Sequence, residues 1–205
     1  MWVCPSWQRR TVEMAPLLEV CVDDVLGLER AIIGGADRIE LCAALPVGGL
    51  TPAPGLIAAA AKVDIPVYAM IRPRAGNFVF SDAEYDIMRA DIDAVRSAGL
   101  AGVVLGANTP DGKLDAALLA KLVQHAQGLG LTLHRAFDLV PDFAEAVDLA
   151  VELGFERILT SGGALTAEAG LDALASIVAH ARGRISIMPG SGVNATNARI
   201  FLTRL

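Results

Sequence analysis

The chain has 205 residues, 54% of them hydrophobic, and carries 17 basic against 23 acidic side chains. This size suffices for one well-buried core and is short for two full domains. The mildly acidic charge, without a basic stripe, argues against nucleic acid and anionic membrane surfaces as partners, and no apolar run is long enough to span a bilayer.

The first residues differ in pattern from the rest of the chain. Trp2 and the pair Arg9-Arg10 follow no periodicity, and no apolar stretch follows the basic pair as a secretion signal requires. We expect residues 1–16 to be a disordered or misassigned N-terminal extension, with Met14 as the natural start. The alternative, an ordered arm packed on the folded domain, stays open.

From Leu17 onward, short apolar or β-branched runs alternate with helical stretches. Ser81-Asp82-Ala83-Glu84 has the spacing of a capping box at the start of one such helix. Regular strand–helix alternation predicts a parallel sheet with helical crossovers. The strands are expected to begin near residues 17, 37, 66, 101, 130, 156 and 184, and the helices to cover about 24–33, 54–62, 82–97, 115–127, 142–153 and 167–181, with a last one from 194.

The two faces of these strands differ in character. A doubly wound sheet buries both faces under helices, whereas a barrel carries helices only outside and accepts polar residues within. The turn after the first strand also lacks the glycine-rich sequence typical of an open dinucleotide-binding sheet. We therefore predict an α/β protein with a TIM-like (β/α) barrel. The aliphatic face is Leu18/Val20/Val22, Ile39/Leu41, Val67/Ala69/Ile71, Leu131/Leu133 and Ile185/Ile187; the inner face is Glu19/Cys21, Arg38/Glu40/Cys42, Tyr68/Met70/Arg72, Thr132/His134 and Ser186/Met188.

The strand count stops at seven. The units repeat every ~28 residues, as a βα repeat needs, so an eighth strand would begin beyond residue 205. We expect residues 17–205 to form a single barrel domain that lacks its eighth strand. The first and seventh strands would then present unpaired edges, covered by a partner chain or by the N-terminal extension.

Two of the strands end in the same signature, Glu19-Val20-Cys21 and Glu40-Leu41-Cys42, which places a carboxylate and a thiol on one side of each. Neighbouring strands lie about 4.8 Å apart, so Cys21 and Cys42 could together hold a soft ion such as Cu(I). They are too few for structural zinc. The alternative is two buried cysteines acting as small apolar fillers.

Glu19 and Glu40 have two interpretations. They could act as acid, base or ligand, or they could pair with Arg38 as a structural ion network inside the barrel. The third cysteine, Cys4, lies in the extension, and reduced intracellular thiols fit this pattern better than a secreted disulfide scaffold.

The best candidate for acid–base chemistry is the segment from Leu133 to Asp138. His134 titrates near neutrality, and Asp138 could orient its ring. The alternative for His134 is a hydrogen-bonded core imidazole.

Two glycine turns follow the sixth and seventh strands, Ser161-Gly162-Gly163 and Gly190-Ser191-Gly192. Their backbone N–H groups, together with Arg72 and Arg74, could cradle a phosphate or carboxylate. The alternative is ordinary tight turns between strand and helix.

Several collinear strings resemble the CutC copper homeostasis family. They are Gly35-Ala36-Asp37-Arg38-Ile39-Glu40-Leu41-Cys42, Gly48-Gly49-Leu50-Thr51-Pro52, Ile71-Arg72-Pro73-Arg74, His134-Arg135-Ala136-Phe137-Asp138 and Leu159-Thr160-Ser161-Gly162. The resemblance implies a TIM-like barrel, a cytoplasmic homodimer and a role in copper handling, with Cys21 and Cys42 as the Cu(I) ligands. The chain departs from the family at Ala75-Gly76-Asn77, where Gly-Gly-Asp is usual, at Pro189-Gly190-Ser191-Gly192, where Ala-Gly-Ala-Gly is usual, and in lacking the eighth strand with its His-Ser-Ser end.

Two functions therefore follow as hypotheses. The first is a copper homeostasis protein that binds Cu(I) through Cys21 and Cys42. The second is a TIM-barrel enzyme acting on a small anionic or phosphorylated metabolite, with Glu40, His134, Asp138 and Arg72 as catalytic residues and Arg74, Ser161, Gly162, Gly190 and Gly192 binding the anion. A seven-stranded fragment without activity of its own is the third possibility.

Overall fold

The computed structural model describes residues 16–205, so the expectation for the N-terminal extension lies outside the described residues, apart from Pro16. Seven parallel strands form one sheet in chain order, each pairing with the next along the sequence. Each expected strand is confirmed to within a few residues. The strands are β1 (Glu19–Val22), β2 (Arg38–Leu41), β3 (Val67–Met70), β4 (Gly102–Leu105), β5 (Gly130–Leu133), β6 (Arg157–Thr160) and β7 (Ser186–Pro189).

Helices connect the strands, as strand–helix alternation predicts. The expected capping box is present at α3, where the Ser81 side chain accepts from the Glu84 N–H and the Glu84 carboxylate accepts from Ser81. Within residues 16–205, no helix combines the length and apolar character needed to cross a bilayer. The helices are α1 (Val25–Ile33), α2 (Pro54–Ala60), α3 (Asp82–Ser97), α4 (Ala116–His125), α5 (Phe143–Glu152), α6 (Leu171–Ala181) and α7 (Ala198–Arg204), with short 3-10 turns η1 (Leu45–Val47) and η2 (Arg135–Leu139).

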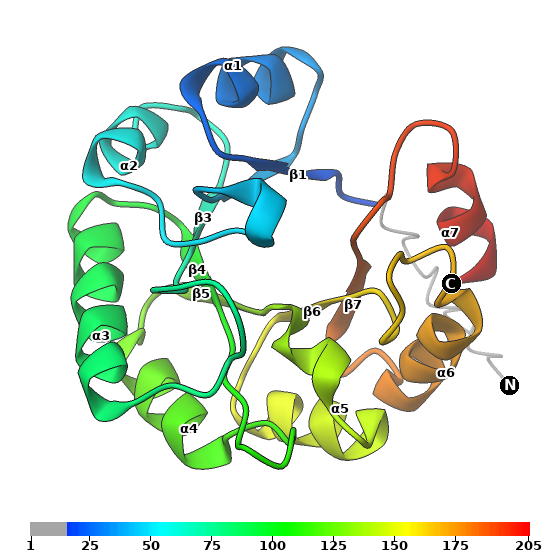
Figure 1. Cartoon of the computed structure of the whole chain (residues 1–205). Coiled ribbons are helices and arrows are strands. Elements are labelled where there is room, and N and C mark those ends of the chain that lie inside the picture. The colour runs from blue at the N-terminus through cyan, green and yellow to red at the C-terminus, as the bar shows by residue number, and fades with distance from the viewer. Residues whose placement is uncertain (1–15) are drawn as a thin grey trace, which may run out of the picture.

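The sheet curls into an open barrel with its helices outside. Figure 1 shows the helices arranged around the curved sheet, with β1 and β7 at its two open edges. The described residues contain no eighth strand to join those edges. The predicted TIM-like barrel of seven strands is therefore confirmed.

Side-chain parity sorts the core into an outer and an inner layer. The aliphatic face of the strands packs under the helices in one large cluster that includes Ile39, Leu41, Val103 and Leu133, all fully buried. Burial of this layer is the main stabilising contribution, at about 25 cal/mol per Å² of apolar surface. The inner face is mixed, so the polar interior expected from the sequence is also confirmed.

The interior is filled at the amino ends of the strands. Tyr68 on β3 lies across the first residues of β4 and β5, where a Cβ on Gly102 would lie 2.2 Å from its ring and a Cβ on Gly130 would lie 2.2 Å from its hydroxyl oxygen. The Arg157 guanidinium stacks on the same ring, with its Cζ 4.5 Å from the ring centroid, and donates to the Thr132 hydroxyl at 2.9 Å. Because this end is closed, the site chemistry is confined to the carboxyl ends, as in other barrels.

Candidate functional site

Cys21 and Cys42 point into the barrel together. Both are free thiols, and their Sγ atoms lie 3.6 Å apart. Cys21 is exposed because β1 is an edge strand, whereas Cys42 is fully buried. Contact with the Cys21 thiol, burial and the nearby Glu40 carboxyl all raise the pKa of Cys42. The two thiols therefore form a pair with one sulfur open to solvent and one sealed in the core.

Glu40 completes this cluster. Its Oε1 lies 3.7 Å from the Cys42 Sγ, and the ligand atoms of Cys21, Glu40 and Cys42 all lie within 4.8 Å of one another. Burial, and then the charge of Glu19, raise the pKa of Glu40 to about 8. The ion network expected inside the barrel forms in part: Arg38 pairs with Glu19, and within residues 16–205 Glu40 has no cationic partner.

Arg72 follows the end of β3, the strand next to the one that Cys42 follows. It is 5% exposed, and its terminal nitrogens donate to the carbonyl oxygens of Val47, Gly49 and Gly76. Its Cζ lies 4.7 Å from the centroid of the Phe78 ring. Burial, together with the charge of Arg74, lowers the pKa of Arg72. The guanidinium therefore organises the loops above β2 and β3 and has only its Nε uncommitted.

His134 lies where expected at the end of β5, but Asp138 does not orient its ring. The ring Nδ1 accepts the Ala136 N–H at 3.1 Å, as a cap on η2. The Phe78 ring packs against it, with centroids 4.8 Å apart. Burial, and then the charge of Arg72, lower the pKa of His134 to about 3. The predicted His134–Asp138 pair is wrong, because the 3-10 turn carries Asp138 toward β6.

The buried imidazole makes stability depend on pH. The pKa of His134 falls from an ordinary 6.5 in the unfolded chain to about 3 in the folded chain. Below pH 6.5 the imidazole is therefore protonated in the unfolded chain and stays neutral in the folded one. We expect His134 to lower the free energy of unfolding between pH 6.5 and 5 by up to about 1.4 kcal/mol per pH unit, against an opposite contribution from Glu40, whose raised pKa stabilises the folded chain as the pH falls over the same range. Urea unfolding of His134→Asn, which keeps a cap acceptor without the titration, is expected to lose this slope. The matched His180→Asn variant keeps it, and equal slopes in both would contradict the assignment.

The Asp138 carboxylate instead accepts hydrogen bonds from the turn after β6. It accepts the backbone N–H of Ser161 at 3.0 Å and of Gly163 at 3.1 Å, the hydroxyls of Thr160 and Ser161, and the Arg135 Nε at 2.7 Å. The Gly162 N–H donates to the Thr160 hydroxyl. The donors of this turn are therefore occupied by a carboxylate of the chain itself, that of Asp138. Binding of an outside anion there stays a prediction.

The other predicted anion ligands have separate partners. Arg74 pairs with Glu84 and donates to the Asn77 and Val79 carbonyl oxygens in its own loop. The Gly190 N–H donates to the Thr160 carbonyl oxygen, and Gly192 adopts a positive φ of 80° in the next turn. Arg72 and Arg74 thus donate to acceptors in the loops after β2 and β3, and their joint binding of an anion with the glycine turns stays a prediction.

Three buried side-chain atoms in the described range have no hydrogen-bond partner. They are the Arg72 Nε, the Asn108 Oδ1 and the His134 Nε2, and they follow the ends of β3, β4 and β5. Unpaired buried polar atoms are rare and point to strain, water or a ligand. Asn108 was missed by sequence reasoning, because nothing in its sequence context marks it as buried.

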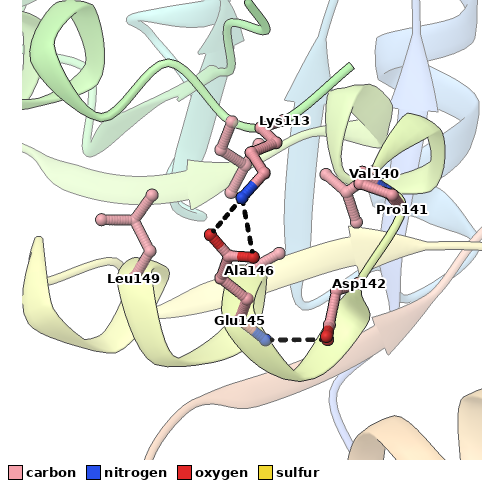
Figure 2. A pocket seen from close by; sticks show the side chains of 8 residues that line it. Lys113, Val140, Pro141, Asp142, Glu145, Ala146 and Leu149 are labelled. Atoms are coloured by element: carbon pink, nitrogen blue, oxygen red, sulfur yellow. Dashed lines mark hydrogen bonds and ion pairs between the residues drawn. The ribbon is translucent and has the colours of Figure 1, made fainter. Parts of the chain in front are cut away.

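Two surface pockets lie away from these residues. Figure 2 shows a shallow one beside α5, where Lys113 donates to the Glu145 carboxylate at 3.0 and 3.2 Å, and the space is only about 20 Å³. A second, of about 250 Å³, lies at the amino ends of β3 and β4 with mainly apolar lining. Neither pocket is lined by the candidate site residues at the carboxyl ends of the strands.

Comparison with known proteins gives a consistent result. The CutC family model matches residues 16–204. A CutC family protein of Sinorhizobium medicae is 66% identical over 189 residues, which are 92% of this chain and 77% of that protein. One from Caulobacter vibrioides is 61% identical over 188 residues, again 92% of this chain and 77% of the relative.

Comparison with solved structures points to the same family as the sequence comparisons. A crystal structure of a candidate copper homeostasis protein, CutC from Streptococcus agalactiae, superposes with a TM-score of 0.87 at 36% identity, covering 92% of this chain and 93% of that one. A deoxyribose phosphate aldolase from Aeropyrum pernix reaches a TM-score of 0.65 at 10% identity, covering 91% and 80%. At that identity the aldolase shares the fold alone.

Proposed function

This chain belongs to the CutC family, and on that premise we propose that it binds copper as Cu(I) through Cys21 and Cys42 and acts in copper homeostasis. One observation carries the proposal, the 3.6 Å separation of two free thiols on neighbouring strands. Soft thiolate ligands select Cu(I), whereas carboxylate-only sites suit harder ions. Cys21 gives an ion a route in from solvent, and Cys42 gives it a buried anchor.

An anaerobic titration of the reduced chain with Cu(I), in competition with a chromophoric chelator, tests this proposal. We expect one Cu(I) per chain, held by the two thiols. Zn²⁺ is expected to compete poorly, because structural zinc requires four ligands and the cluster offers two thiols and one carboxylate. A chain that fails to withdraw Cu(I) from the chelator would contradict the proposal.

The cytoplasmic location and the homodimer belong to the same proposal. Two free thiols in contact suit a reducing compartment. The unpaired edges of β1 and β7 in the described residues support self-association, since an exposed strand edge is a template for pairing.

A second candidate function, an enzyme acting on a small anionic metabolite, is favoured by the three unpartnered atoms. The Ala136 N–H holds the His134 Nδ1 as an acceptor, so the neutral ring carries its proton on Nε2. The Asn108 amide donates to the carbonyl oxygens of Gly112 and Ala136, which fixes its Oδ1 as a free acceptor. With the Arg72 Nε, the ends of β3, β4 and β5 supply two donors and one acceptor, the set of groups that would pair with the carboxylate and hydroxyl of a hydroxycarboxylate.

Titration with glycolate, acetate and inorganic phosphate tests this second function. We expect glycolate to shift the His134 Nε2–H resonance and to bind more tightly than acetate, because only glycolate offers a hydroxyl to Asn108. Phosphate, whose oxygens are tetrahedral and not coplanar like those of a carboxylate, is expected to bind worst beneath the Phe78 ring. Equal weak shifts with all three probes would remove this candidate.

A further inference from the structure

We propose that Met70 supplies a third sulfur ligand to the copper site, through its thioether. The inference rests on the proposed function, since it names a ligand for the same ion. It begins from the bond lengths. Metal–thiolate bonds of about 2.3 Å would span about 4.6 Å if the two sulfurs lay on opposite sides of the ion. The observed separation is 3.6 Å, so with the thiols in these positions an ion bound by both would lie off the line between them and would leave room for a further ligand.

Met70 lies beside Cys42 on the next strand. The register pairs Leu41 of β2 with Ala69 of β3, so the next position along each strand brings Cys42 level with Met70. Both side chains face inward, and they share an apolar cluster with Tyr68 and Val104. Met70 is 3% exposed and Cys42 is fully buried. Neighbouring strands are about 4.8 Å apart, which is within reach of a flexible methionine.

Gly49 packs closely against both of these side chains. A Cβ on Gly49 would lie 2.9 Å from the Cys42 Sγ and 3.4 Å from the Met70 Cε. Its φ of +83° also favours glycine over other residues. The Cys42 thiol and the end of the Met70 side chain therefore both reach Gly49, so the two side chains lie close to each other.

The alternative third ligand is the Glu40 carboxylate. Cu(I) is a soft ion and prefers thiolate and thioether sulfur to carboxylate oxygen. The other inward-facing methionine, Met188, has its sulfur engaged by the Arg38 guanidinium at 3.8 Å. Within residues 16–205 no hydrogen bond involves the Met70 sulfur. Among the described residues, Met70 is therefore an inward-facing thioether that neighbours Cys42 and has no hydrogen-bond partner.

Selenium labelling tests this assignment directly. The full chain is produced with selenomethionine, loaded with Cu(I), and measured by X-ray absorption at the copper and selenium edges. We expect one selenium at bonding distance from copper, in addition to two sulfurs. Met70→Leu is expected to abolish the copper–selenium signal, retain the two sulfurs and weaken Cu(I) binding by roughly 10- to 100-fold. Met188→Leu is the matched control and is expected to keep the signal.

The outcomes separate this inference from the function on which it rests. Copper bound by two sulfurs without selenium in the unsubstituted chain overturns the role of Met70 and leaves the thiol site intact. A chain that binds no Cu(I) overturns both. If Met70→Leu does not fold, labelled Met14→Leu and Met188→Leu decide the question, since Met88 lies on α3 in the outer cluster and a copper–selenium signal kept in both variants supports Met70.

Discussion

Cys42→Ser is expected to lower the affinity for Cu(I) by more than about a hundredfold, beyond what the loss of a supporting contact around a metal site causes. Cys42 is the anchor because it is fully buried, contacts the Cys21 thiol at 3.6 Å and lies next to the inward-facing Met70. A serine hydroxyl is a hard ligand that stays protonated, so it cannot replace a thiolate on a soft ion. Chelator competition at constant pH measures the change.

Matched cysteine variants make this result specific. Cys21→Ser is expected to weaken binding to a similar degree with less effect on stability, because its side chain is exposed. Cys4→Ser, outside the described residues, is expected to leave binding unchanged. Circular dichroism of each apo variant separates lost ligation from lost folding. Full Cu(I) affinity in the folded Cys21→Ser, Cys42→Ser double variant would refute the thiol site.

The architecture was predictable from the sequence because two signals are local. Strand–helix alternation sets a parallel sheet, and a period of two assigns each strand residue to one face. The inward set of Cys21, Glu40, Cys42 and Tyr68 followed from parity alone, and the structure has the same set. The Cys21–Cys42 contact was predictable for the same reason, since consecutive strands in a barrel are neighbours.

The contacts of the loops were not predictable in this way. His134 and Asp138 are close in sequence, yet an intervening 3-10 turn sends the carboxylate to β6 and leaves the imidazole capped by Ala136. Arg72 and Arg74 share a motif, but one is buried over Phe78 and the other pairs with Glu84 at the start of α3. Loop geometry depends on which donors remain unpaired after the sheet forms, and parity carries no information about that.

Asp138→Ala is expected to lower the free energy of unfolding by about 3 kcal/mol. Removing one partner of a buried ion pair destabilises by about 3–5 kcal/mol, and the lower end applies because the Arg135 side chain is 39% exposed. The variant also leaves the backbone N–H groups of Ser161 and Gly163 without their acceptor. Urea unfolding, with the midpoint and slope fitted together, measures the loss.

The matched control is a second aspartate–arginine pair at the same sequence spacing. Asp86 and Arg89 lie three residues apart on α3 with 3.5 Å between their charged atoms, and the Asp86 side chain is 71% exposed. Asp86→Ala is expected to change stability by less than about 0.5 kcal/mol, as surface substitutions do. A similar small change for Asp138→Ala would mean that the turn after β6 finds another acceptor.

Unchanged Cu(I) stoichiometry in Asp138→Ala is also expected, because the thiols lie on β1 and at the end of β2, whereas Asp138 ties η2 to the turn after β6.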